Sequence, residues 1–418
     1  MVIKCDVLVV GAGPAGSSAA RAAAEAGANT IFVDKKKEIG VPVQCAEGLG
    51  EYLIPFLPFK IPEEFLKWRI DGLSFWTEDI TIKRKGGSWA GYAIDRDSFD
   101  KWLANNAIEA GARLHLETEL IDLEFGENYR VTKAIVKIGD RVKEIEPKVV
   151  IAVDGVDSTV LDLLGLKKKK KASTGEIRSF EMHNLRLDNP HYDQLFMGDF
   201  APGAYGYIFP KSKNTANVGA GFLFPKKSLD RCYEEFLEIP KVKSQIKNAT
   251  CIKEKTGRVP FCYLTDKWAY GNVLLAGDVA NQNIKPLVEG FLPAIICGDL
   301  AGKRVAKYLT GKGALDSYQK DIENKLGFLF KGSDILLNIV YDLFQSEEKK
   351  EMLLALGINT NIFSYKKIEK LKKENYEELK RKLDNWNNSK IRQALTYLSE
   401  MSFFFLHKKV HISFPDPA

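Results

Sequence analysis

A glycine-rich turn near the N-terminus constrains the fold more than any other feature of the sequence. Residues 11–16 read Gly-Ala-Gly-Pro-Ala-Gly, which is the pattern G-x-G-x-x-G. An apolar, β-branched run at 6–10 precedes the turn, and an alanine-rich segment at 17–26 follows it. This order predicts a buried strand, a tight turn and a helix that packs closely on a parallel sheet. The chain should therefore begin with an α/β unit.

Each glycine of this turn has its own expected role in binding a dinucleotide. Gly11 permits the sharp turn, Gly13 lets the backbone approach a pyrophosphate, and Gly16 lets helix and strand pack closely. The helix start would direct free N–H groups and the positive end of its dipole at the phosphates. Asp34 follows the next predicted strand and is placed to accept ribose hydroxyls. We predict a dinucleotide site here; a tight turn without a ligand is the alternative.

Length and composition exclude several classes of protein. The chain has 418 residues, enough for two or three domains and a large core. A hydrophobic share of 45% and a charged share of 28% exclude global disorder. The net charge of +6 is too mild to indicate a nucleic-acid partner, and none is expected. Six cysteines without a C-x-x-C pair are too few for a disulfide scaffold, which favours a reducing, cytoplasmic setting.

A peripheral contact with a membrane stays open at this stage. No apolar run reaches the roughly 18 residues that a membrane-spanning helix needs. Five consecutive lysines at 167–171 are either a solvated linker or a contact with phosphate or lipid headgroups. The segment 401–406 contains three consecutive phenylalanines, which either cover the core or lie at a lipid interface.

Two later segments indicate which dinucleotide the predicted site would bind. Asp154-Gly155 and Gly277-Asp278 each follow a buried apolar run. Together with the glycine turn, and in this order, they resemble the FAD-binding signature of the p-hydroxybenzoate-hydroxylase-like flavoproteins. The resemblance implies that Asp278 contacts the ribityl chain of FAD and that the following helix points its N-terminus at the flavin. Arg96 matches that family's arginine near the pyrophosphate, with a helix-capping role as the alternative.

The fold class expected from these patterns is α/β, with a discontinuous Rossmann-like FAD-binding domain. Residues 1–165 and 266–312 are assigned to that domain. Residues 166–265 alternate short strands with aromatic side chains, which predicts an inserted antiparallel β-sheet that serves as a substrate domain. Part of 55–95 is expected to join this sheet. Residues 313–418 are rich in Lys and Glu and predict a C-terminal helical region.

A narrower resemblance concerns two further stretches. Residues 40–48, Gly-Val-Pro-Val-Gln-Cys-Ala-Glu-Gly, resemble the P-x-x-C segment of the archaeal geranylgeranyl reductases, the digeranylgeranylglycerophospholipid reductase family. Residues 201–221 are similar to that family's Y-x-W-x-F-P…G-x-G stretch, with Tyr207 where tryptophan is usual. The resemblance covers roughly residues 1–310. It implies an FAD-dependent oxidoreductase that reduces C=C bonds of geranylgeranyl chains in prenyl lipids by hydride transfer from reduced flavin. The electrons would come from an external donor: ferredoxin, NAD(P)H or another reductant.

The same resemblance implies a set of site residues. Leu120 would act only through its backbone near the adenine. The expected cofactor-binding positions, the motif glycines included, are Gly11, Gly13, Ala15, Gly16, Asp34, Cys45, Ala46, Gly48, Arg96, Leu120, Asp278, Gly290 and Phe291. The expected substrate pocket consists of Tyr205, Tyr207, Phe209 and Phe222; an ordinary apolar sheet face is the alternative.

The proton donor has three candidates, namely Cys45, Tyr205 and water. Cys45 is either a small residue packed beside the flavin, a thiol close to the substrate, or a chance match. His407 and His411 are four residues apart but have no carboxylate neighbours, so no metal site is expected.

Two departures from the family pattern bear on the mechanism. The loop at 279–291 is about one residue longer than usual and places Lys285 before a proline. Lys285 is predicted either to stabilise the anionic reduced flavin or to face solvent. Val160 and Leu161 replace an arginine that usually follows Asp154-Gly155, which argues against direct reduction by NADPH.

Three other activities of flavoproteins compete with the reductase. They are an FAD-dependent monooxygenase of the same fold, a flavin-dependent prenyl cyclase, and an electron-transfer flavoprotein that acts on a quinone. A reductase adds two hydrogens per double bond, whereas cyclisation adds none.

Overall fold

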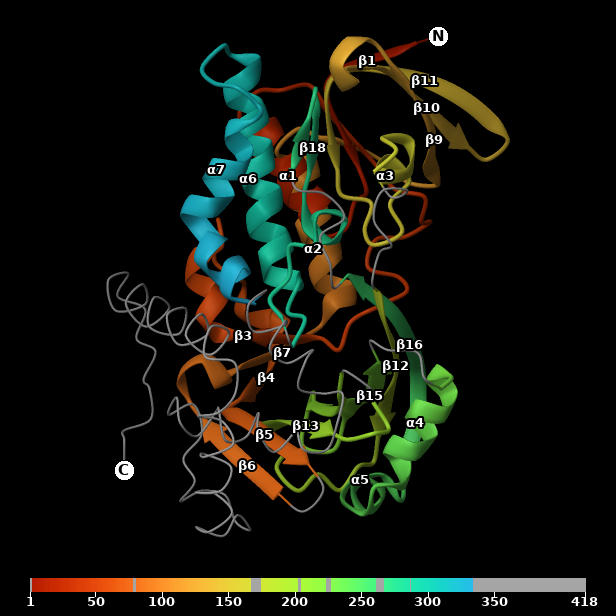
Figure 1. The fold of residues 1–418 in the computed structure, drawn as a ribbon, viewed down its shortest axis with the longest axis vertical. Helices are drawn as coiled ribbons and strands as arrows, with labels where there is room; N and C mark the ends of the chain where they lie inside the picture. The colour runs from red at the N-terminus through yellow and green to blue at the C-terminus, as the bar shows by residue number, and fades with distance from the viewer. Residues whose placement is uncertain are drawn as a thin grey trace, which may run out of the picture.

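The computed structural model has two large sheets, which lie in opposite halves of the molecule along its long axis (Figure 1). It describes residues 2–77, 80–166, 174–201, 204–222, 227–260, 267–285 and 287–333.

The first sheet is built around the predicted strand–turn–helix unit. The central strand β1 (Ile3–Val10) pairs in parallel with β2 (Thr30–Val33) on one side and with β11 (Arg141–Ala152) on the other. Parallel strands β18 (Val273–Leu275) and β8 (Arg113–His115) extend the two sides. Three further strands complete the sheet in antiparallel pairing: β9 (Thr118–Phe125), β10 (Val131–Ile138) and β17 (Ala269–Tyr270).

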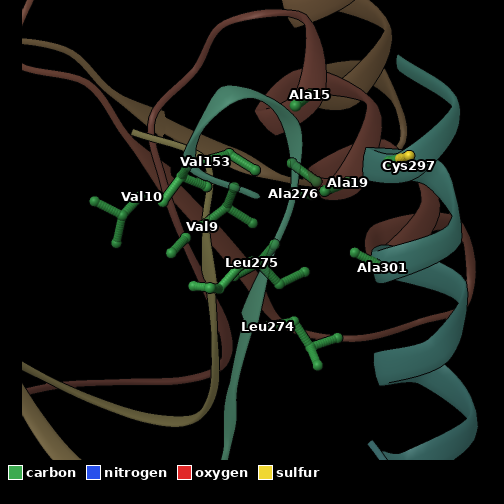
Figure 2. Packing of buried hydrophobic residues seen from close by; sticks show 14 of the residues in the cluster. Val9, Val10, Ala15, Ala19, Val153, Leu274, Leu275, Ala276, Cys297 and Ala301 are labelled. Atoms are coloured by element: carbon green, nitrogen blue, oxygen red, sulfur yellow. The ribbon is translucent and has the colours of Figure 1, made fainter. Parts of the chain in front are cut away.

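Helices cover this sheet, and two of them approach each other closely. A Cβ atom at Gly298 of α6 (Phe291–Leu309) would lie 2.1 Å from the Ala15 oxygen of α1 (Pro14–Glu25). Only a glycine permits such contact. Figure 2 shows Ala15 and Ala19 beside Cys297 and Ala301 in the same buried cluster as Leu274 and Leu275. The other helices are α2 (Arg96–Glu109), α3 (Thr159–Leu163) and α7 (Ser317–Ile322).

The second sheet has the strand order β16–β12–β15–β14–β13–β5–β6. Its strands are β5 (Gly72–Thr77), β6 (Ile80–Lys85), β12 (Thr174–His183), β13 (Tyr192–Met197), β14 (Gly206–Pro210), β15 (Ala216–Phe222) and β16 (Thr250–Pro260). Neighbours are antiparallel except β5 and β13, which are parallel. The sheet is therefore mixed rather than antiparallel, because β5 comes from an earlier part of the chain and lies beside β13.

The two faces of the second sheet have different neighbours. Phe196, Ile208 and Val218 pack against the helix α4 (Leu229–Glu238), which is followed by α5 (Pro240–Ile246). Leu195 and Tyr207 alternate with them and point to the opposite face. That face is turned toward the first half of the molecule. A small sheet of β3 (Gly48–Gly50), β4 (Leu66–Ile70) and β7 (Gly91–Ile94) lies between the two halves.

Two element boundaries follow from the local backbone. The helix α6, which follows the Gly277-Asp278 segment, begins at Phe291, so its N-terminus lies directly after Gly290. β8 and β9 are separate strands, because Glu117 between them adopts a positive φ of 49°.

Several predictions fall on parts of the chain outside the described residues. These are the lysines at 167–171, the phenylalanines of 401–406, His407 and His411. Of the helices that are described, none has the length and apolar character to cross a membrane. The described residues contain no cluster of His, Cys, Asp and Glu suited to a metal ion.

Candidate active site

The glycine turn at the end of β1 leaves open space at one position. A Cβ at Gly11, whose φ is +108°, would lie 2.4 Å from the Val153 oxygen. A Cβ at Gly16 would lie 1.9 Å from the Gly11 oxygen. The chain's own packing therefore requires both glycines. A Cβ at Gly13, by contrast, would meet no atom within 4 Å. Space beside the start of α1 is where a phosphate group binds in a dinucleotide fold.

Asp34 is fixed against this turn. Its Oδ2 accepts a hydrogen bond from the Ala12 amide at 2.8 Å, and its Oδ1 accepts one from the Lys36 amide at 2.9 Å. A cavity of about 170 Å³ opens beside the turn. Its walls include Ala12, Gly13, Asp34, Gly40, Gln44 and Arg96. The structure thus places three of the predicted cofactor residues, Gly13, Asp34 and Arg96, around one polar cavity.

Arg96 is the first residue of α2 and is held from two sides. Its Nε and Nη2 donate to the two oxygens of Asp100 at 2.7 and 2.8 Å. Its guanidinium lies 4.1 Å from the ring centroid of Phe291. Phe291 begins α6, so Arg96 connects the start of α2 with the start of α6. A planar cation fixed in this way can bind a phosphate without losing side-chain freedom.

Asp278 and Gly290 lie together at the start of α6. A Cβ at Gly290 would be 3.4 Å from Asp278 Oδ1. Burial raises the pKa of Asp278 to about 6, and the positive charges of Arg96 and Lys285 oppose that rise. Ala15 is adjacent, because its Cβ would be 3.2 Å from a Cβ at Gly277. The glycine turn, the Gly277-Asp278 segment and the start of α6 therefore lie together.

Lys285 is buried, so the prediction that it faces solvent is wrong. Only 1% of the residue is exposed. Ile284 and Glu289 exchange backbone hydrogen bonds of 3.0 and 2.9 Å, which closes the loop around Lys285. The closed loop directs the lysine inward, and Lys285 lines the large cavity next to the site.

The large cavity has a volume of about 390 Å³ and lies on one face of the second sheet. Residues within 44–52, 89–91 and 284–291, together with Leu329, form its other walls. Of the predicted pocket residues, Tyr205, Tyr207 and Phe209 line it. A Cβ at Gly219 would lie 2.5 Å from the Tyr207 ring, so this glycine makes room for the ring to lie across the sheet.

Phe222 does not line this cavity, in contrast to the prediction. Side chains alternate along β15, so Phe222 shares the face of Val218 and Ala220. Both of those residues pack on the side of α4. Phe222 is buried there instead.

The remaining predicted residues are distributed as follows. Cys45, Ala46 and Gly48 line the large cavity, on the side of the first sheet. The Cys45 sulfur accepts a hydrogen bond from the Glu47 amide at 3.2 Å. The Tyr205 hydroxyl donates to the Leu287 oxygen at 2.6 Å, and burial raises its pKa. Leu120 is a buried residue of β9, in the core of the first sheet.

Glu47 is a central residue that the sequence analysis missed. It is 2% exposed and adopts a φ of +62°, a conformation that non-glycine residues rarely adopt. Its Oε2 accepts from Lys255 Nζ at 2.5 Å and from Lys211 Nζ at 2.6 Å, and its Oε1 accepts from the Arg96 amide at 3.2 Å. The carboxylate thus joins the segment 45–48 to the second sheet and to α2. No local pattern indicates this, because the lysines lie 164 and 208 residues away.

Two further carboxyl groups line the large cavity and were also missed. Asp193 stands on β13, and Glu289 stands in the loop before α6. Asp193 lies between Tyr192 and Gln194 at the start of β13, a stretch that the sequence analysis treated only as part of a sheet.

The buried ion pairs of Glu47 should make the free energy of unfolding depend on pH in the acidic range. Burial raises the pKa of Glu47, but the charges of Lys255 and Lys211 outweigh it and lower the pKa to about 2 from an ordinary 4.5. A carboxyl with a depressed folded-state pKa stabilises the fold above its unfolded pKa and loses that contribution as the pH falls. We expect the free energy of unfolding to fall between about pH 4.5 and pH 2. Denaturant unfolding across this range measures it.

The variant Glu47→Gln should lose about 3 kcal/mol at neutral pH, because it leaves buried lysines with one carboxylate fewer. It should also flatten the pH dependence between pH 4.5 and 2. Glu238→Gln is the matched control, since Glu238 forms an exposed pair with Lys243 and should change stability by less than about 0.5 kcal/mol. Equal losses in both variants would contradict this account.

Comparison with known proteins agrees with the geometry in both halves. A family described as FAD dependent oxidoreductase matches residues 6–155, and the geranylgeranyl reductase catalytic domain matches residues 177–259. The first match contains the glycine turn, and the second contains the aromatic wall of the large cavity.

Two curated relatives are each named digeranylgeranylglycerophospholipid reductase. The protein of Methanococcus aeolicus is 36% identical over 77% of this chain and 81% of its own length. That of Methanocaldococcus jannaschii is 34% identical over 87% of this chain and 94% of its own.

Solved structures show the same fold. A geranylgeranyl bacteriochlorophyll reductase-like protein from Thermoplasma acidophilum has a TM-score of 0.76 and 26% identity, and the match covers 91% of this chain and 96% of that one. A myxobacterial chondrochloren halogenase has a TM-score of 0.67 and covers 82% of this chain and 84% of its own, but at 14% identity it is similar in fold alone.

Proposed function

The chain belongs to the digeranylgeranylglycerophospholipid reductase family of FAD-dependent oxidoreductases, and from that membership we propose that it reduces the C=C bonds of geranylgeranyl chains in a prenyl lipid. The observation that carries the proposal is the meeting of two sites. The polar cavity at the dinucleotide turn and the large aromatic cavity are adjacent, because Gln44 lines both of them. The next residues along the chain, Cys45, Ala46 and Gly48, line the large cavity.

The residues of the first site fit FAD. Gly13 leaves space at the start of α1, Asp34 stands at the end of β2, and Arg96 lies across the cavity. We propose that Gly13 and Arg96 hold the pyrophosphate, that Asp34 accepts the ribose hydroxyls, and that Asp278 accepts from the ribityl chain. The predicted positions Ala15, Gly290 and Phe291 would pack against the coenzyme. When bound and reduced, FAD supplies the hydride.

The second site fits a long hydrocarbon. Its walls are mainly apolar and aromatic, including Leu73, Leu195, Tyr207 and Phe209. Apolar pockets of a few hundred Å³ with a few polar groups are typical of sites for small hydrophobic ligands. The chain's own residues would align the prenyl segment and exclude water from the reacting carbons.

The electron donor is proposed to be external to this chain. Val160 and Leu161 stand where related flavoproteins carry an arginine, and both are fully buried in the structure. Neither can bind a phosphate of NADPH, which favours a carrier such as ferredoxin. Because the proposed substrate is a membrane lipid, we also propose a peripheral contact with the bilayer surface.

The first test concerns the coenzyme and uses two glycines of the same turn. A methyl group at Gly13 would touch no protein atom within 4 Å, so Gly13→Ala should keep the stability of the coenzyme-free protein within about 0.5 kcal/mol. The methyl would occupy the space for the pyrophosphate, so the affinity for FAD should fall at least about tenfold. Fluorescence titration with FAD and thermal unfolding measure the two effects.

Gly16→Ala is the matched control. Its Cβ would lie 1.9 Å from the Gly11 oxygen, so this variant should lose stability even without FAD. If Gly13→Ala binds FAD as tightly as the wild type does, the coenzyme does not lie at the start of α1.

The second test concerns the substrate. Purified protein with FAD is reduced with dithionite and incubated with a geranylgeranyl glycerophospholipid, and the lipid is analysed by mass spectrometry. A reductase adds two mass units for each double bond. A product of unchanged mass would indicate a cyclase, a hydroxylated product formed in air with NADPH a monooxygenase, and turnover of a soluble quinone with untouched lipid an electron-transfer flavoprotein.

The third test concerns Lys285, which we propose stabilises the negative charge of reduced flavin. Removal of its charge in Lys285→Met should lower the midpoint potential of bound FAD. A loss of about 1.4 kcal/mol corresponds to about 30 mV for a two-electron couple. Spectroelectrochemical titration measures the potential, and Lys243→Met, an exposed lysine, serves as the control. An unchanged potential in Lys285→Met would exclude this role.

A further inference from the structure

Asp193 places a carboxyl group in the apolar wall of the large cavity. It is the second residue of β13, and it shares a face with Leu195, which lies two positions further along the strand. Its partner in the parallel register is Leu73 of β5. Both leucines line the cavity with Asp193. Within the described part of the chain, the Asp193 carboxyl forms neither an ion pair nor a hydrogen bond.

The carboxyl lies where the cavity meets the segment proposed to touch the coenzyme. A Cβ at Gly48 would be 3.9 Å from Asp193 Oδ2 and 3.5 Å from the Phe209 ring. Gly48 belongs to the segment 45–48, and Phe209 belongs to the aromatic wall. Asp193 therefore stands at the boundary between the two sites.

A second carboxyl group, that of Glu289, lies in the same cavity wall and differs from Asp193 in its hydrogen-bond donors. Its Oε1 accepts from the Gly50 amide at 2.7 Å, and its Oε2 accepts from the Tyr52 hydroxyl at 2.8 Å. Burial raises the pKa of Glu289, and these two donors oppose that rise because they stabilise its ionised form. Burial, and then the negative charge of Glu289, raise the pKa of Asp193 to about 8. Both acids are buried, but only Glu289 has these donors, so Asp193 is the one of the pair that holds its proton more tightly.

The other groups around the cavity do not compensate Asp193. Lys255 is bound to Glu47 and Glu181 at 2.5 and 2.9 Å. Lys285 also lines the cavity, but its charge acts on Asp278, and Glu289 is the charge that acts on Asp193. The remaining titratable groups of the lining are Cys45, Tyr52, Tyr205 and Tyr207.

We propose that Asp193 is the proton donor of the reduction, and this inference rests on the proposed function. The π electrons of the alkene form a C–H bond with the carboxyl proton of Asp193 at one carbon, and the O–H bond breaks. Reduced FAD, when bound, would supply a hydride with its two electrons to the neighbouring carbon. Asp193 is left as a carboxylate and regains a proton from water between turnovers. The sum is one hydride and one proton added to one double bond.

The geometry favours Asp193 over the tyrosine proposed from the sequence. The Tyr205 hydroxyl donates its hydrogen to the Leu287 oxygen, so that proton is already engaged. Burial also raises the pKa of Tyr205, which makes it a weaker acid. Cys45 lines the same cavity, and the test therefore includes it.

The experiment measures a single turnover of dithionite-reduced enzyme with geranylgeranyl glycerophospholipid, followed by reoxidation of the flavin. Asp193→Asn should slow this step at least about a hundredfold, as expected for a lost general acid. Its FAD affinity and its reduction by dithionite should match those of the wild type. Asp193→Glu should restore part of the rate. The wild-type rate should be constant below about pH 8 and fall above it, as Asp193 loses its proton.

An infrared titration tests the carboxyl group without activity. Because burial also raises the pKa of Glu289 and Asp154, the difference between two spectra is measured. The coenzyme-free wild type at pH 7 should show the carbonyl band of a protonated carboxyl that is missing from Asp193→Asn. If wild-type enzyme leaves the lipid unreduced, the proposed function fails and this inference fails with it. If the wild type reduces the lipid and Asp193→Asn does so equally fast, or if only Cys45→Ser is slow, Asp193 is not the donor and the function stands. Absence of the infrared band in the wild type would also overturn the inference.

Discussion

The close approach of α1 to its surroundings is the constraint on which the rest of the structure depends. A Cβ at Gly16 would lie 1.9 Å from the Gly11 oxygen, and a Cβ at Gly298 would lie 2.1 Å from the Ala15 oxygen. Backbone oxygens cannot move aside as flexible side chains can, so these contacts fix the start of α1 against the strand ends and against α6. The one glycine of the turn with open space, Gly13, then lies at a defined position beside Asp34 and Arg96. The same packing that holds the helix therefore defines where a nucleotide can bind.

Buried charge connects this half of the molecule to the second sheet. Glu47 accepts from Lys255 and Lys211 of the sheet region and from the Arg96 amide of α2. Buried pairs of this kind cost several kcal/mol to break, because the remaining charge has no solvent. The network thus holds the segment 45–48 between the dinucleotide turn and the aromatic cavity, where Gly48 faces Asp193 and Phe209. The charges position the residues, and the apolar cavity determines what can bind.

The sequence predicted what depends on local pattern. The glycine spacing and the flanking apolar runs predicted β1, the turn and α1, and the two later dipeptides placed Asp154 and Asp278 at strand ends. The aromatic stretch placed Tyr205, Tyr207 and Phe209 together, and all three line the cavity. The prediction that Phe222 lines the cavity was wrong. The face on which a side chain lies depends on the strand register, and the composition of the stretch does not reveal that register.

What the sequence could not predict depends on pairing between distant segments. Lys285 is buried because its loop closes through Ile284 and Glu289. Asp193 enters the cavity because β13 pairs with β5, more than a hundred residues earlier in the chain. Neither pairing leaves a signal in neighbouring residues. The mixed second sheet has the same origin, because only the distant strand β5 introduces a parallel pair.

A crystal structure of the protein with FAD and an unreactive geranylgeranyl lipid tests the central claim most directly, because that claim is the meeting of two sites. The account predicts the pyrophosphate beside Gly13, the flavin ring between the segment 45–48 and the start of α6, and the prenyl chain along Tyr207 and Phe209. A coenzyme bound away from the glycine turn, or a lipid bound outside the cavity, would contradict it.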